Sequence, residues 1–133
     1  MKIILLFALT TLSCFLSGQN LVDYKDREIR KYMKENKTNM SFNKVRNDRY
    51  NYLKYTDNSD SQTLLFFLNS DSICRSIRII CDSDVKAEKV KEFNKLYKKK
   101  DENIWVDRRN NVDYLIEVKD EEWSLVITIK PLK

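Results

Sequence analysis

The chain contains no histidine, and among its 133 residues there is a single glycine and a single proline. Without histidine there is no imidazole that could act as a near-neutral base or ligate a metal, so the usual hydrolytic triads are excluded. The glycine, Gly18, lies near the N-terminus, so no glycine-rich loop follows it that could cradle a phosphate or a dinucleotide. We therefore expect no enzyme activity, no catalytic residue, no metal site and no cofactor.

Cysteine is scarce as well, because Cys14, Cys74 and Cys81 are too few for a disulfide scaffold. Cys74 and Cys81 lie seven positions apart in one predicted strand. They should then point to opposite faces about 23 Å apart, a distance that excludes a bond between them. A β-bulge near Arg75 and Ser76 would make an internal disulfide possible again. The sequence leaves their redox state open.

The N-terminus has the pattern of an export signal. One lysine precedes an apolar run over residues 3–16, which is too short to span a bilayer and is followed by small and polar residues. Cleavage after Gly18 would remove residues 1–18 and leave residues 19–133 as one secreted or periplasmic domain. Cleavage before Cys14 would instead create a lipid anchor and a membrane-bound lipoprotein. The first cleavage is favoured, because no leucine lies three residues before that cysteine.

Residues 19–133 carry a modest positive charge. Removing the predicted signal takes away Lys2 and no acidic residue, so the net charge falls from +5 to +4. A chain of this length forms one domain that buries about 65% of its unfolded surface and folds without disulfides or metal ions. Outside the cytoplasm, nucleic acid is not an expected partner.

Hydrophobic periodicity predicts two helices and six strands. Helical spacing covers residues 21–36 and a second segment that begins near Asp84 and closes at the lysines of positions 98–100. Between and after these helices, apolar residues alternate or run continuously, as in strands. The predicted strands are residues 49–56, 63–68, 73–81, 104–108, 112–119 and 123–130.

This order, one helix, three strands, one helix and three strands, fits an α+β fold. We expect a mainly antiparallel sheet of about five to six strands with two helices packed on one face. The opposite face is then more apolar than a bare solvent face needs to be. The residues expected on it are Leu53, Tyr55, Leu65 or Phe67, Leu115 and Val126.

Basic and tyrosine side chains alternate from Lys44 to Tyr55. Positive charge next to stacking rings is typical of surfaces that bind polyanions. Outside the cell, the anions would be polysaccharides or lipid headgroups. Polyanion binding through this region is therefore one alternative function.

A second alternative is a carboxylate-based hydrolase. Glu117, Glu121 and Glu122 cluster next to Trp123. Paired carboxylates catalyse glycoside hydrolysis only in a pocket that sets their spacing and raises one pKa. A turn between two strands favours a solvated, edge-protecting role instead.

Several short segments resemble those of a loose group of small secreted proteins from Bacteroidetes-type bacteria. The resemblance implies export and a single domain, and it brings no known activity. The matching segments are Ser17-Gly18-Gln19-Asn20, Ile29-Arg30-Lys31-Tyr32-Met33, Leu64-Leu65-Phe66-Phe67-Leu68, Ile73-Cys74 and Glu121-Glu122-Trp123.

The sequence therefore predicts an exported, non-enzymatic domain that binds a macromolecular partner or assists at the cell envelope. The partner is an unspecified protein or envelope component, and the oligomeric state is left open. The candidate partner-binding residues are Arg46, Arg49, Tyr50, Tyr52, Tyr55, Phe67 and Leu115.

Overall fold

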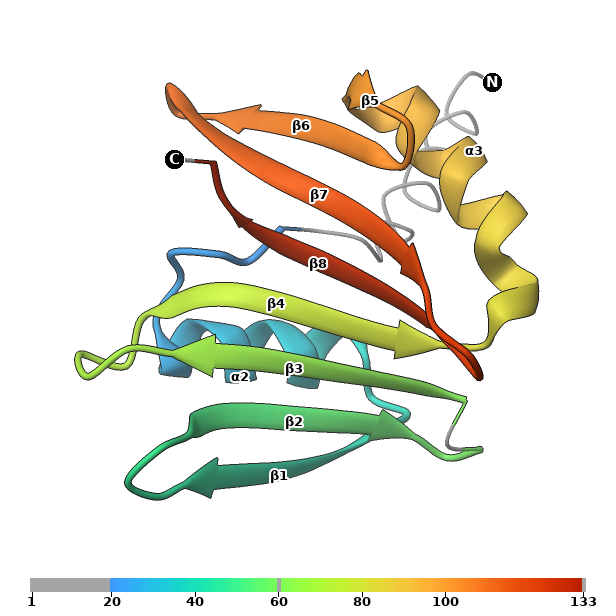
Figure 1. The fold of residues 1–133 in the computed structure, drawn as a ribbon. Helices are drawn as coiled ribbons and strands as arrows, with labels where there is room; N and C mark the ends of the chain where they lie inside the picture. Colours follow the sequence, from blue (N-terminus) through green and yellow to red (C-terminus); the bar gives the residue numbers. More distant parts are fainter. Residues whose placement is uncertain (1–19, 60, 133) are drawn as a thin grey trace, which may run out of the picture.

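An eight-stranded antiparallel sheet with two short helices forms the fold (Figure 1). The computed structural model describes residues 20–59 and 61–132, so the predicted signal peptide and Cys14 lie outside the described residues. The elements are α2 (Asp26–Asn36), β1 (Met40–Arg46), β2 (Asn51–Asp57), β3 (Gln62–Leu68), β4 (Cys74–Cys81), a 3₁₀ turn (Ser83–Val85), α3 (Lys86–Leu96), β5 (Lys98–Asp101), β6 (Ile104–Arg109), β7 (Val112–Asp120) and β8 (Leu125–Pro131).

The sheet consists of two four-stranded meanders joined side by side. Its strand order is β1-β2-β3-β4-β8-β7-β6-β5, and every neighbouring pair is antiparallel. The chain leaves the first meander at β4, passes through α3 to the far edge and returns strand by strand to β4. The first and second halves of the chain therefore meet at the β4–β8 pair.

One face of the sheet is buried across its six inner strands. The register places Leu53, Phe66, Ile77, Ile129, Ile116 and Trp105 in one row across six strands, and each is at most 3% exposed. Burying a large apolar side chain contributes about 1.5–3 kcal/mol relative to leaving it in water. This row is therefore the centre of the hydrophobic core.

The helices add few residues to this core. In α2, only Ile29 and Met33 are buried, and in Figure 1 the helix lies behind β3 and β4. In α3, only Phe93 is buried, and its ring packs against Trp105 with 5.3 Å between the ring centroids. The Trp105 indole N–H donates to Asn94 at 2.9 Å, which fastens α3 to β6.

The prediction of five to six strands with two helices packed on one face is therefore wrong. The sequence does not predict β1 (Met40–Arg46), because this strand has little hydrophobic alternation. It also does not predict β5 (Lys98–Asp101), because lysines are typical of the last turn of a helix. Both strands lie at edges, where one neighbour fixes the backbone and the side chains need not be buried. The residues thus form a sheet with short helices beside it.

Residues 20–25 are not helical, although the spacing of residues 21–36 predicts a helix from Leu21 onward. Val22 and Asp23 form a turn instead, in which Asp23 has a φ of 78°. Arg109 of β6 holds this segment, since its guanidinium donates to the carbonyl oxygens of Asn20 and Val22, each at 2.6 Å, and to the Tyr114 hydroxyl at 3.1 Å. The Tyr114 hydroxyl donates in turn to Asp23. Side-chain bonds therefore tie the start of the described chain to β6 and β7.

Replacing this anchor should destabilise the protein, whereas replacing its neighbour should not. We expect Arg109→Met to lower the free energy of unfolding by about 2–4 kcal/mol, because it leaves buried carbonyl groups unpaired. Arg108→Met removes only an exposed ion pair with Asp113 and should change the free energy of unfolding by less than about 0.5 kcal/mol. Urea unfolding followed by tryptophan fluorescence measures both, and equal losses would contradict the role of Arg109.

Candidate binding face

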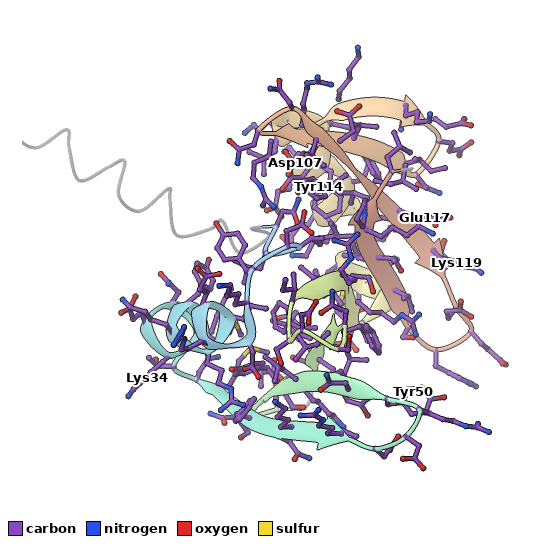
Figure 2. The ribbon with its side chains drawn as sticks, turned by 90° about the vertical axis from the view of Figure 1, so that its left-hand side faces the viewer. Lys34, Tyr50, Asp107, Tyr114, Glu117 and Lys119 are labelled. Carbon is purple, nitrogen blue, oxygen red and sulfur yellow. The ribbon has the colours of Figure 1, made fainter. Side chains whose placement is uncertain are left out.

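The face of the sheet opposite the core has no described helix or strand packed over it. In Figure 2, α2 and Lys34 lie to the left of the sheet, while Glu117 and Lys119 lie on the right, where only side chains project. This open face is half-buried rather than bare, because large apolar residues alternate with the core residues. They are Tyr52, Leu65, Phe67, Ile80, Ile104, Val106, Leu115 and Val126.

Three aromatic rings form a ladder at one end of the open face. Tyr50 and Tyr52 meet edge to face with 6.4 Å between centroids, and Tyr52 meets its cross-strand partner Phe67 with 5.4 Å between centroids. The Arg78 guanidinium lies over the Phe67 ring at 5.5 Å. Such edge-to-face and cation–π contacts hold the rings upright on the sheet. Tyr50, Tyr52 and Phe67 are called the aromatic ladder below.

Unpaired positive charge borders the aromatic ladder. Lys54 and Arg78 flank Leu65 in one cross-strand row, about 10 Å apart at a strand spacing of 4.8 Å. Neither residue has an ion-pair partner within the described part of the chain. The nearest carboxylate along this row is Glu117, two strands beyond Arg78. The ladder therefore lies in a locally positive region.

The structure brings together only some of the predicted partner-binding residues. Tyr50, Tyr52 and Phe67 form the ladder, whereas Leu115 lies on the same face three strands from Phe67, about 14 Å away. The other candidates lie elsewhere. Arg46 and Arg49 are exposed at the β1–β2 hairpin, and Tyr55 is buried on the helix side.

The placement of Leu53 and Tyr55 on the open face is therefore wrong. Both are buried, at 0% and 5% exposure, and they pair with the core residues Phe66 and Leu64. The alternation within β2 was correct, but a segment with large apolar or aromatic groups on both sides does not reveal which side the helix covers. Burial also raises the pKa of the Tyr55 hydroxyl to about 12, so it stays neutral.

Arg78 is a site residue that the sequence analysis missed. It lies between Ile77 and Ile79 in β4, and both of these neighbours are buried while Arg78 is exposed. The available signal was a single arginine between two isoleucines, Ile77 and Ile79. This signal was obscured because the strand begins with an irregular segment around Arg75.

That irregular start also corrects the prediction for the cysteines. Phe67 pairs with Ser76 and Leu68 with Cys74, so Arg75 is an extra residue in a β-bulge. The bulge turns Cys74 to the same buried side as Cys81, not to the opposite one. Both thiols are nevertheless free, because the strand still separates them by about 20 Å.

Two carboxylates of the hydrolase alternative lie at the surface of the sheet's last turn. Glu121 and Glu122 are exposed in the turn before β8, and the grooves beside α2 are lined by other residues. The neighbouring Trp123 is 84% exposed and precedes β8, so its predicted place in a strand over residues 123–130 is wrong. Within the described residues, no group of three or more acidic or cysteine side chains is placed to hold a metal ion.

Comparisons with protein-family models, curated proteins and solved structures found no match. The resemblance to small secreted bacterial proteins thus stays a prediction. Within the described residues, no helix has the length and apolarity to cross a bilayer.

The buried thiols should resist chemical modification. Burial raises the pKa of Cys74 to about 12 and also raises the pKa of Cys81, so little reactive thiolate exists at neutral pH. We expect iodoacetamide at pH 8 to leave both cysteines unmodified in the folded protein and to modify both in urea. Intact mass spectrometry counts the adducts. Rapid modification without urea, or a mass lower by two hydrogen atoms that reverts with reductant, would contradict this assignment.

Proposed function

We propose that the protein is an exported, non-enzymatic binding domain that recognises a macromolecule of the cell envelope through its open sheet face. The chemistry of the face favours an acidic polysaccharide as this ligand. The observation that carries the proposal is the aromatic ladder bordered by the unpaired cations Lys54 and Arg78.

The rings supply a binding platform. Tyr52 and Phe67 are only half-exposed, and their neighbours hold them in place, so little side-chain freedom is lost when a ligand binds. Flat ligand rings gain about 1–3 kcal/mol each by stacking on such aromatic groups, as nucleic-acid bases do. The apolar faces of sugar rings are suited to the same platform.

The cations supply selectivity for acidic ligands. Guanidinium groups bind carboxylates in a two-point geometry, and Arg78 has no carboxylate partner among the described residues. Lys54 lies about two strand spacings away in the same row. The spacing between Lys54 and Arg78 suits a polysaccharide chain that carries carboxylates along its length. The predicted export favours a polysaccharide over a nucleic acid as the polyanion.

Binding to sodium alginate, a polyuronate, tests this proposal. We expect measurable affinity by isothermal titration calorimetry, which falls as salt is raised because ion pairs are screened. The double variant Tyr52→Ala, Arg78→Gln should bind at least tenfold more weakly, since it removes one stacking ring and one cation.

Matched controls separate the face from general charge. Lys31→Gln removes one exposed cation of α2, on the other side of the sheet, and should leave the alginate affinity unchanged. Uncharged dextran should not bind. The proposal is rejected if the double variant retains its alginate affinity, if dextran binds equally well, or if alginate does not bind at low salt.

A further inference from the structure

A groove of about 380 Å³ lies between α2 and β1, on the side of the sheet opposite the open face. Its apolar floor is formed by Met40 and Phe42 of the edge strand and Tyr55 of β2. Its rim is formed by Arg30 and Lys34 of α2 and by Lys37, which follows the helix. The volume falls in the range of ligand-binding clefts. Nothing in the proposed function uses this groove.

The floor presents an unusually exposed aromatic ring. Phe42 is 43% exposed although it packs against Tyr55, with 5.0 Å between the ring centroids. The Arg30 guanidinium lies 5.0 Å from the Phe42 ring centroid, so a rim cation is held directly above the floor. An incoming apolar group would bury the remainder of this ring.

The rim is a line of charge rather than a single point. Arg30, Lys34 and Lys37 are four and three residues apart, a spacing that places them along one side of the helix over about 10 Å. Arg30 also pairs with Asp26, but Lys34 has no ion-pair partner among residues 20–59 and 61–132. Such a line suits a ligand with several negative charges along its length.

The adjacent edge of β1 has unpaired backbone groups. The Asn47 N–H donates to the Tyr50 carbonyl at the hairpin end, so in the antiparallel alternation the odd-numbered residues of β1 face β2. Phe42, Lys44 and Arg46 therefore direct their N–H and C=O groups outward, where no other described strand lies. These groups form a template for another strand.

The two edges of the sheet differ in how they are protected. β5 has four residues, three of them lysine, which is typical of an edge that avoids pairing. β1 has seven residues and no proline, and only its Lys44 and Arg46 carry charge. Lys44 is in addition drawn onto the helix side by an ion pair of 2.8 Å with Asp26. The β1 edge is thus the one suited to pairing.

We propose that the β1 edge and the α2–β1 groove together bind an extended acidic peptide segment of a partner protein by β-strand addition. The backbone of the peptide pairs with Phe42, Lys44 and Arg46, its apolar side chains cover Phe42, and its carboxylates face the rim of α2. In this mode the main-chain bonds provide affinity and alternate side chains provide specificity. Antiparallel pairing of two copies is disfavoured, because it would bring two cationic rims together.

A fluorescein-labelled peptide of twelve residues with the repeat Val-Thr-Glu-Thr is a direct probe, because every second residue of a strand lies on one face and its valines and glutamates can then all face the groove. We expect binding, measured by fluorescence anisotropy, that weakens at least tenfold when two alternate backbone nitrogens on the pairing edge are methylated. Replacing each glutamate by lysine should abolish binding. A methylated peptide that binds as well as its parent would overturn strand addition, because its charge and side chains are unchanged.

Variants of the protein test the same contacts. Lys44→Pro removes an outward N–H at an edge position where proline is tolerated, and it should weaken binding at least tenfold more than Lys44→Ala, which removes the same side chain. Lys34→Glu should weaken binding, whereas the equal charge change Lys31→Glu outside the groove should not.

The remaining outcomes are also decisive. Equal binding to Lys44→Pro and Lys44→Ala would overturn the proposal, and so would equal effects of the two helix substitutions. If the proline variant does not fold, as judged by its thermal unfolding, the methylated peptide still decides. Sodium laurate at a submicellar concentration serves as the competing ligand class, and binding of laurate without binding of the peptide would reject a strand partner.

Discussion

The fold depends on an eight-stranded sheet that is too wide for its two short helices to enclose. Each helix has 11 residues and so is about 16 Å long, whereas eight strands at 4.8 Å spacing span about 34 Å. The buried residues of both helices and of the segment before α2 join the core on the side of Trp105 and Ile116. They are Leu21, Val22, Ile29, Met33 and Phe93. No helix or strand within residues 20–59 and 61–132 covers the other face. On this open face, the Phe67 ring contacts both the Tyr52 ring and the Arg78 guanidinium. These contacts fix the orientation of the two rings although no described helix covers them.

An open sheet of this kind also leaves two edges, and each needs its own protection. β5 is short and lysine-rich. The Lys99 ammonium group lies 5.0 Å from the Trp105 ring centroid, so this side chain also covers part of the core. At the other edge, Lys44 is bound to Asp26 of α2. The pKa of Asp26 is lowered overall, because the bonds and charges of Lys44 and Arg30 outweigh the effect of burial. That ion pair fixes β1 to the helix and leaves the outer backbone of β1 available.

Much of the central sheet could be predicted from the sequence, because buried strands show their alternation directly. The hairpin at Asn110 and Asn111 was also predictable, since both residues adopt the positive φ angles, 51° and 67°, that asparagine tolerates. The edge strands and the orientation of β2 could not be predicted, because they depend on pairing partners rather than on local pattern. The same limit applies to the candidate site. Tyr52, Phe67 and Arg78 are neighbours only through the registers of two hairpins and a bulge at Arg75, and a shift by one residue would send each to the core.

The two proposed surfaces share β2 without sharing a side chain. Tyr52 projects to the open face and Tyr55 to the groove, so one strand connects the ladder with the floor. A strand added beside β1 would widen the sheet by one strand and would leave the open face uncovered. Both ligands can therefore occupy one molecule if both proposals hold. Because β2 is paired on both sides by seven and five residues, its backbone is held in register and neither ligand needs to move it. Such a molecule would link an acidic polysaccharide to a partner protein, and the two binding energies would add rather than compete.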